Sequence, residues 1–137
     1  MSFKGQKDGA EGIKVTNCSN IILADFTVQD EDGDNIKVQE TDGISFRRLT
    51  AEWTGKPSKK NGAYGLYPVS CKNVLIENCT AKGASDAGIY VGQSRNIEVK
   101  DCIARALHPL CVLNGVIFFE RPVIIDAMTR AQTRHGA

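Results

Sequence analysis

The chain of 137 residues has no excess of either charge, few aromatic residues and no long apolar run. Its 17 basic and 16 acidic side chains leave a net charge of +1, so the composition gives no reason to expect nucleic acid as a partner. The longest apolar stretch, residues 110–119, is broken by Asn114 and Gly115 and is shorter than the roughly 20 residues that span a membrane. We therefore expect no nucleic-acid binding and no membrane insertion.

Cysteine spacing and the N-terminal composition exclude two further classes. None of the five cysteines forms a CxxC pair, so the spacing of a structural zinc site is absent. The first residues, MSFKGQKDG, contain no apolar segment of the kind that an export signal requires. The length suits one domain with a core and is too short for two. The location in the cell is therefore unknown from this chain alone.

What the sequence does contain is an internal repeat. Its origins are Ile13, Ile36, Leu66 and Ile89, and apolar or small residues recur 8, 10, 13 and 15 positions after each of them. Each repeat therefore holds three short strands with one buried face, and stacked repeats form parallel sheets. The sequence predicts an all-β fold, a right-handed, single-stranded parallel β-helix of about four coils over residues 1–105.

Two columns of corner residues support this register. Position +7 of the coils is occupied by residues that tolerate a left-handed backbone, namely Asn20, Gly43, Asn73 and Asn96. Stacked asparagines can also hydrogen-bond along the column. A second corner precedes the first strand of each coil and holds Gly12, Asn35, Gly65 and Gly88. Cys79 and Cys102 stack within disulfide reach, but we expect free thiols that serve as small core residues.

The period fails after Ala104, and residues 106–137 form an aberrant, irregular tail. Two origins are open for this tail: a shifted reading frame, which we favour, or an improvised cap. The segment from Pro122 to Arg134 has the pattern of a short helix, which would make the tail partly helical. Coil ends expose open strand edges, so end-to-end self-association is a further expectation.

Two segments resemble a bacterial family of parallel β-helix repeat proteins within the pectate-lyase-like superfamily. They are NGAYGLYPVSCKNVLIENC at 61–79 and GASDAGIYVGQSRNI at 83–97, and the resemblance runs from about residue 3 to residue 105. Members of that family are typically several times longer and are exported. The resemblance implies that this chain is a fragment and that its full-length relatives lie in the periplasm or cell envelope. It implies no reaction.

The strongest candidate site is an outward-facing strip at position +1 of the coils, formed by Lys14, Lys37, Tyr67 and Tyr90. Aromatic faces stack on sugar rings, and lysines pair with uronate carboxylates. The strip therefore predicts binding of an acidic polysaccharide, with Trp53 in the enlarged corner of the second coil as a further contact. The alternative is a solvated face on which the two tyrosines form a ladder.

A second candidate is the acidic corner of the first coil. Asp30, Asp32 and Asp34 are spaced like the start of a calcium loop, and oxygen ligands suit Ca²⁺. The distal glutamate of an EF-hand is absent, so a solvated acidic turn is the alternative. Columns of mixed charge elsewhere, which include Arg47 and Arg48, we interpret as structural.

Three functions remain open. The first is a carbohydrate-binding or scaffold solenoid, and the second is a polysaccharide lyase or epimerase that acts on uronate-containing polymers. The third is a fragment with no independent function. No serine–histidine–aspartate, cysteine–histidine or two-carboxylate arrangement can be assembled from the repeat, so the catalytic residues are unknown.

Overall fold

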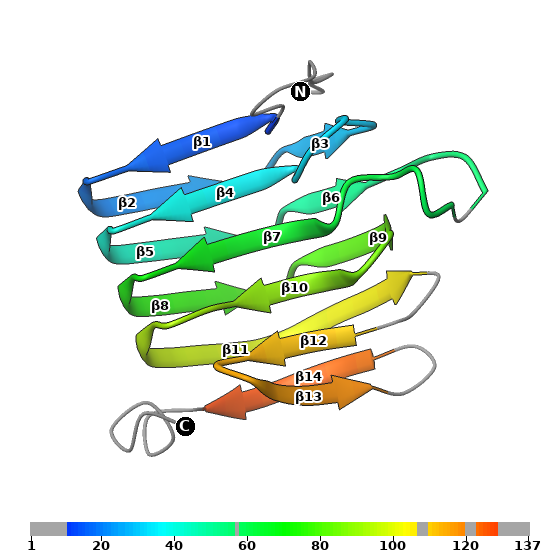
Figure 1. Ribbon diagram of the computed structural model, residues 1–137. Helices are drawn as coiled ribbons and strands as arrows, with labels where there is room; N and C mark the ends of the chain where they lie inside the picture. The colour runs from blue at the N-terminus through cyan, green and yellow to red at the C-terminus, as the bar shows by residue number, and fades with distance from the viewer. Residues whose placement is uncertain (1–10, 57, 107–109, 120–122, 129–137) are drawn as a thin grey trace.

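The computed structural model describes residues 11–56, 58–106, 110–119 and 123–128, with the backbone alone for 106, 110, 116–119 and 123–128. These ranges hold β-strands and no helix (Figure 1). Accordingly, the described part of the chain offers no helix that is long and apolar enough to cross a membrane. The strands stack into a solenoid whose successive turns lie on one another.

One face of the solenoid is a six-stranded sheet. Its first five members run parallel, and they are β1 (Ile13–Thr16), β4 (Ile36–Gln39), β7 (Tyr64–Val69), β10 (Ala87–Val91) and β12 (Leu110–Leu113). Ile13 pairs with Ile36, Ile36 with Leu66, and Leu66 with Ile89. These are the four predicted coil origins, so the register of the repeat is confirmed.

The other strands form an eight-stranded sheet. The second strands of the first three coils are β2 (Ser19–Ala24), β5 (Asp42–Arg47) and β8 (Lys72–Glu77). The third strands are β3 (Thr27–Gln29), β6 (Thr50–Glu52) and β9 (Thr80–Ala84). In the fourth coil, β11 (Arg95–Ala106) runs as one strand beside both β8 and β9 and joins the two sets. With parallel pairing throughout the coils, the fold is a right-handed parallel β-helix.

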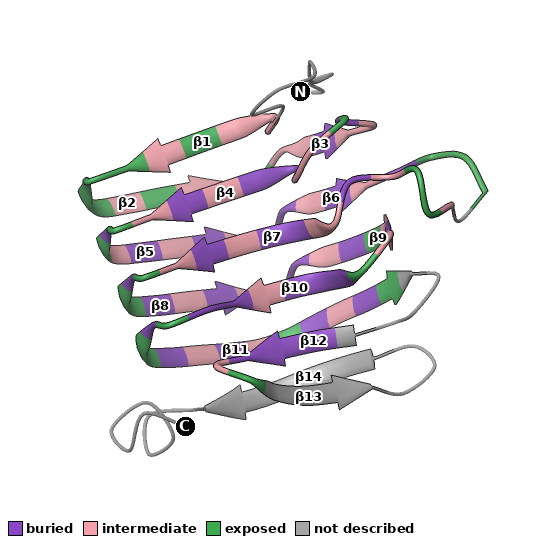
Figure 2. Cartoon of the chain, viewed as in Figure 1, coloured by how far each residue is buried: buried purple, intermediate pink, exposed green. Residues whose placement is uncertain are grey.

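The core lies between the two sheets, and along strands such as β4 and β5 its buried positions alternate with partly exposed ones (Figure 2). Ile36, Phe46, Leu66, Ile76 and Ile89 are each 0% exposed. Each of these large side chains contributes roughly 1.5–3 kcal/mol through its removal from water. The first coil is less covered, because its apolar side chains pack against the core and remain only partly buried.

The predicted asparagine corner is left-handed. Asn20, Asn73 and Asn96 have φ of 55° and Gly43 has φ of 86°. Asn96 Nδ2 donates to Asn73 Oδ1 at 2.6 Å, and Asn73 Nδ2 donates to Asp42 Oδ1 at 2.9 Å, so the amide ladder forms along part of the column. Two more left-handed columns were not foreseen. They comprise Asn17, Glu40, Ser70 and Gln93, and then Asp25, Arg48, Asn78 and Asp101.

The second corner column, which precedes the first strand of each coil, does not require a left-handed backbone. Gly12, Gly65 and Gly88 are absent from the residues with positive φ. Glycine is needed there for close approach, because a Cβ on Gly65 would lie 2.7 Å from the carbonyl oxygen of Gly88. On Gly12 it would lie 2.8 Å from the carbonyl oxygen of Asn35 in the next coil. The column therefore reflects coil-to-coil contact instead of backbone handedness.

The tail is more regular than the sequence predicts. Cys111 pairs with Ile89, so β12 supplies the first strand of a fifth coil, after which β13 (Val116–Phe119) turns back antiparallel to it. β14 (Val123–Met128) then pairs antiparallel with β11. The helix predicted from residue 122 is wrong over 123–128, because the backbone groups at the open edge of β11 pair with this segment. The remainder of that predicted helix lies outside the described residues.

Candidate functional site

The predicted strip comes together on the outer face of the six-stranded sheet. Lys14 pairs in register with Lys37, and Lys37 pairs with Tyr67. The ring of Tyr90 lies 5.4 Å from that of Tyr67, centroid to centroid, in an edge-on arrangement. The strip therefore follows β1, β4, β7 and β10 in order (Figure 1). Lys14 is exposed and the other three side chains are partly exposed.

A third tyrosine, which the repeat pattern missed, completes this site. The Tyr64 ring lies 4.8 Å from the Tyr67 ring and 4.5 Å from the Tyr90 ring. We call Tyr64, Tyr67 and Tyr90 the tyrosine cluster. Tyr64 is the first residue of β7, two residues before the coil origin. The predicted strip took only the residues at position +1, so it did not include Tyr64. The three rings provide an aromatic surface bordered by lysine.

Lys37 and Asp34 give the cluster its charge. Lys37 Nζ lies 5.5 Å from the centroid of the Tyr67 ring, within the range of a cation–π contact. Asp34 Oδ1 accepts a hydrogen bond from the Tyr64 backbone N–H at 3.1 Å. Burial raises the pKa of Asp34, and burial followed by the charge of Asp34 raises the pKa of Tyr67. Asp34 therefore binds the backbone of one cluster residue and raises the pKa of another.

The phenol of Tyr64 keeps its proton. Burial, and then the negative charge of Asp86, raise its pKa to about 12, and a hydrogen bond to Asp86 adds to this effect. At neutral pH the hydroxyl is a hydrogen-bond donor and not a base, since a catalytic base works best with a pKa near the ambient pH. This chemistry suits recognition of sugar oxygens better than proton abstraction.

Trp53 lies apart from the strip, directly after β6, and its ring is not exposed to solvent. It is 7% exposed, and its indole Nε1–H donates to the carbonyl oxygen of Glu31 at 2.7 Å. Its backbone N–H donates to the Lys82 carbonyl at 2.9 Å. The expected sugar contact required Trp53 to be an exposed residue of the enlarged corner. Packing of the enlarged corner against the neighbouring coils buries it instead.

The acidic corner does not form the expected calcium cluster. Both carboxylate oxygens of Asp30 accept from Thr54, one from its N–H at 2.8 Å and one from its hydroxyl at 2.9 Å. Asp34 is turned to Tyr64, and Asp32 is exposed. Across the described ranges, no group of three or more acidic, histidine or cysteine side chains is placed to hold a metal ion. The structure thus does not bring Asp30, Asp32 and Asp34 together as ligands.

Glu31, between these aspartates, is a buried carboxylate. It is 2% exposed, and neither of its carboxylate oxygens has a hydrogen-bond partner among the described residues. Burial raises its pKa, and the charges of Asp32 and Asp30 raise it further. A buried carboxylate in this position is costly in its ionised form.

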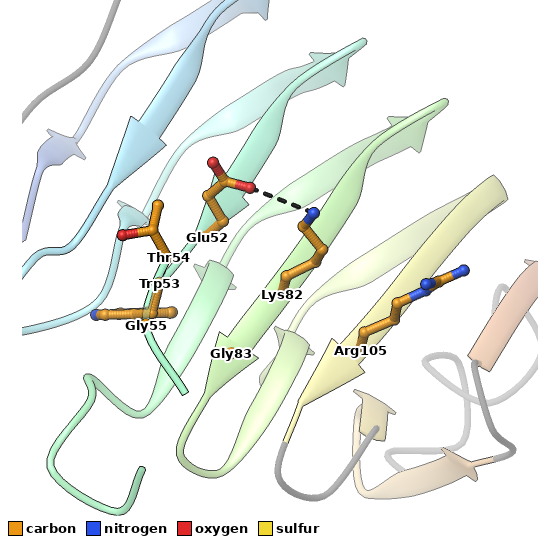
Figure 3. A pocket seen from close by; sticks show the side chains of 7 residues that line it. All are labelled: Glu52, Trp53, Thr54, Gly55, Lys82, Gly83 and Arg105. Carbon is orange, nitrogen blue, oxygen red and sulfur yellow. Dashed lines mark ion pairs between the residues drawn. The ribbon is translucent and has the colours of Figure 1, made fainter. Parts of the chain in front are cut away.

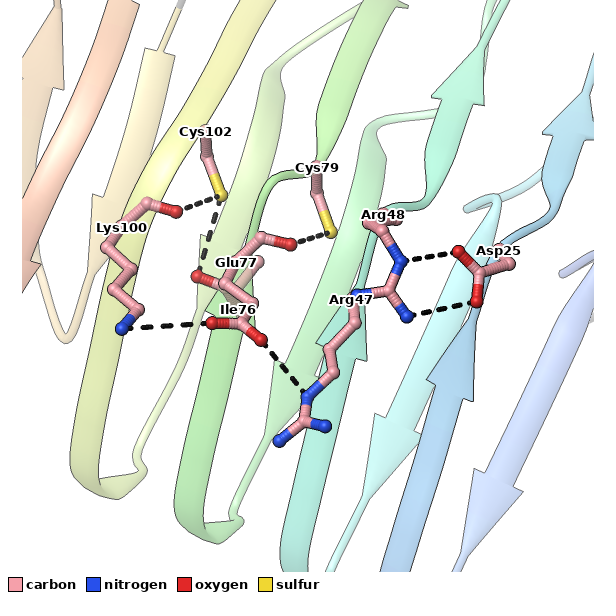
Figure 4. Close-up of polar contacts among 8 residues, drawn as sticks. All are labelled: Asp25, Arg47, Arg48, Ile76, Glu77, Cys79, Lys100 and Cys102. Carbon is pink, nitrogen blue, oxygen red and sulfur yellow. Dashed lines mark hydrogen bonds and ion pairs between the residues drawn. The ribbon is translucent and has the colours of Figure 1, made fainter.

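The mixed-charge columns pair between coils (Figure 4). Arg48 forms a bidentate ion pair with Asp25, with Nε 2.5 Å from Oδ1 and Nη2 3.0 Å from Oδ2. Glu77 lies between Arg47 at 3.1 Å and Lys100 at 3.8 Å. These contacts are at least partly exposed and join neighbouring coils, which agrees with the structural interpretation.

One cysteine of the repeat, Cys18, is exposed, and the other four lie in the core. Cys71, Cys79, Cys102 and Cys111 are buried and unbridged. A hydrogen bond with Cys79, followed by burial, raises the pKa of Cys102, and burial alone raises that of Cys111. A thiol needs to ionise and to be reached by its target, so these side chains act as small core residues.

Comparison with known proteins agrees with this architecture. No curated protein and no solved structure matches the chain. The model of one protein family, described as the right-handed beta helix region, matches residues 3–115. That range contains all four predicted coils and extends through β12 to Gly115. The chain therefore belongs to the right-handed β-helix family.

Proposed function

We propose that this chain binds an acidic polysaccharide along the strip, with the tyrosine cluster as the platform. One observation carries the proposal: three tyrosine rings lie 4.5–5.4 Å apart on one outer face, with Lys37 Nζ 5.5 Å from the Tyr67 ring. Aromatic rings favour the apolar faces of sugars, and a lysine beside them favours a carboxylate.

The dimensions of the strip suit a short stretch of polymer. Neighbouring strands are about 4.8 Å apart, so the column from Lys14 to Tyr90 is about 14 Å long. The two lysines occupy one end and the tyrosines the other. A polymer lying along the column would meet cations first and ring faces next. Because these side chains are at least partly in water, each contact is weak and affinity comes from several of them together.

A lyase or epimerase is the alternative, and the site favours it less. Both reactions begin when a base removes the proton at sugar C5. Tyr64, the cluster residue with the most raised pKa, stays protonated at neutral pH, since that pKa is about 12. A binding or scaffold role needs no such base. Location in the cell envelope is part of this proposal and rests on the resemblance to exported repeat proteins.

Retention on immobilised polymer tests the proposal. The intact chain is passed over polygalacturonate, alginate and neutral dextran, with and without Ca²⁺, while absorbance of unsaturated product is followed. Retention on the two acidic polymers without product supports the binder. Product that depends on Ca²⁺ would establish a lyase instead, and a changed uronate composition by NMR would establish an epimerase. Equal behaviour on dextran and on the acidic polymers would refute acidic-polysaccharide recognition.

A further inference from the structure

A concave site lies on the eight-stranded sheet, away from the sheet that carries the tyrosine cluster. It has a volume of about 480 Å³, within the range of roughly 300–1,000 Å³ typical of small-molecule sites. Its walls come from the ends of β6, β9 and β11 and from the start of the long corner after β6 (Figure 3). The residues that define it are Glu52, Trp53, Gly55, Lys82 and Arg105.

Two cations lie on neighbouring strands at this site. Lys82 and Arg105 are direct partners in the register of β9 and β11, and both are exposed. Like charges directly opposite one another destabilise a sheet unless a counter-charge lies near. Figure 3 shows them beside Glu52 on successive strands.

Glu52 can neutralise only part of this charge. Its Oε1 lies 3.6 Å from Lys82 Nζ, while its Oε2 accepts from Gln29 Nε2 at 2.5 Å. The lysine side chain is 50% exposed, so that ion pair is weak. Arg105 forms no ion pair within the described part of the chain. Among the described residues, one cation of the hollow therefore has no counter-charge.

Hydrogen bonds hold one wall of the hollow in place, and another part of its lining leaves space for a larger side chain. Two hydrogen bonds, to Glu31 and to Lys82, hold Trp53 in place. A Cβ built on Gly55 would meet nothing within 4 Å, and the φ of this glycine is not in the left-handed region. A side chain at this lining position would therefore meet no steric obstacle.

We infer that this hollow binds an oxyanion, a carboxylate or a sulfate group, between Lys82 and Arg105. A planar guanidinium accommodates two oxygens of such a group, and the ammonium supplies a further donor. The group can belong to a small sugar acid or to a free anion. The inference does not depend on the proposed function, because the tyrosine cluster lies on the other sheet.

Trp53 provides the measurement, since it is the one tryptophan of the chain and lines the hollow. The intact protein is titrated with digalacturonate, with sulfate and with neutral lactose, and tryptophan fluorescence and binding heat are recorded. We expect saturable binding of an anion and none of lactose. Arg105→Gln and Lys82→Gln should each weaken the apparent Kd about tenfold or more, and added salt should act in the same direction.

Matched controls come from the same sheet. Lys72 and Arg95 face each other in register on β8 and β11 but do not line this hollow. Lys72→Gln and Arg95→Gln remove the same charges and should leave the titration unchanged. Gly55→Phe keeps both cations and should abolish binding by occupying the open space. Tyr67→Ala should have no effect on the change in Trp53 fluorescence, which separates this site from the strip.

The anions distinguish the sources of the oxyanion. Similar affinity for sulfate and digalacturonate would mean that the charged group alone is recognised, and binding of digalacturonate only would identify a sugar acid. Both results support the inference. It is overturned if neither anion gives a saturable signal by fluorescence or heat. It is equally overturned if Arg105→Gln, Lys82→Gln and Gly55→Phe, all shown to be folded by circular dichroism, bind as the unchanged protein does.

Discussion

The indole Nε1–H of Trp53 donates to the backbone carbonyl of Glu31 at 2.7 Å. Because Trp53 follows β6 and Glu31 follows β3, this bond ties the enlarged corner of the second coil to the acidic corner of the first. Trp53 is 7% exposed and Glu31 is 2% exposed, so the bond is shielded from water. It gives the sole tryptophan a structural role.

Replacing this tryptophan should cost stability and spare polysaccharide binding. In Trp53→Phe a smaller aromatic ring replaces the indole and the Glu31 carbonyl loses its partner, which we expect to lower the free energy of unfolding by about 1–3 kcal/mol. Urea unfolding measures this change, and retention on polygalacturonate is compared in parallel. A variant that unfolds like the unchanged protein but is no longer retained would show that Trp53 contacts the sugar and does not stabilise the fold.

Glu31 should make the protein less stable as pH rises. Burial raises its pKa above the ordinary value of 4.5, so the native state holds the proton more tightly than the unfolded chain does. Its contribution is complete below pH 4.5 and is lost as pH rises toward the higher native pKa. Glu31→Gln should therefore raise stability at neutral pH by about 1 kcal/mol or more.

Urea unfolding across this pH range, with exposed Glu40→Gln as the control, measures the effect. Glu40→Gln should follow the pH profile of the unchanged protein, whereas Glu31→Gln should flatten it. An unaltered pH profile in Glu31→Gln would show that the carboxylate finds a partner in solution.

Two glycines with different surroundings test the close-approach explanation of the corner column. A Cβ on Gly65 would lie 2.7 Å from the Gly88 carbonyl oxygen, so Gly65→Ala should destabilise the fold by about 1–3 kcal/mol. Gly55→Ala meets nothing within 4 Å and should be neutral or slightly stabilising. Melting temperatures of the two variants should separate clearly. Equal melting temperatures would contradict the assigned role of Gly65.

Tyr64 should titrate far above an ordinary tyrosine. Its pKa of about 12 predicts that a phenolate absorbance step near that pH is missing in Tyr64→Phe. The native state binds this proton more tightly than the unfolded chain does, so stability should decline between about pH 10 and 12. Spectrophotometric titration of both proteins decides the matter. A normal pKa would mean that burial and Asp86 do not act on the ring as inferred.

The sequence predicted the coils because their cause is local and repeated. Apolar residues at fixed offsets determine which face of each strand is buried, and the pairing of Ile36 with Leu66 follows directly. The sequence could not separate the two roles of glycine. Gly43 has a left-handed backbone, whereas Gly65 is needed for space, and that distinction depends on the neighbouring coil.

The candidate site was predicted in part for the same reason. Lys37 and Tyr67 share the outward position, so the period brings them together. Tyr64 was missed because it lies at the start of β7, before the coil origin. Arg105 was missed because it belongs to a column that carries no repeated residue type. The β14 strand was missed because its apolar residues pair with an open edge, which is a tertiary cause. The frameshift origin of the tail stays a prediction that the nucleotide sequence can test.

Calorimetric titrations with polygalacturonate that compare Tyr67→Ala with Tyr67→Phe test whether the tyrosine cluster binds the polymer. The phenylalanine keeps the ring beside Lys37, Tyr64 and Tyr90, so its affinity should stay within about twofold of the unchanged protein. The alanine removes the ring and should weaken binding about tenfold or more. Lys37→Gln should weaken binding as well, while Lys72→Gln on the other sheet should not. Unchanged affinity in a folded Tyr67→Ala protein would contradict the account.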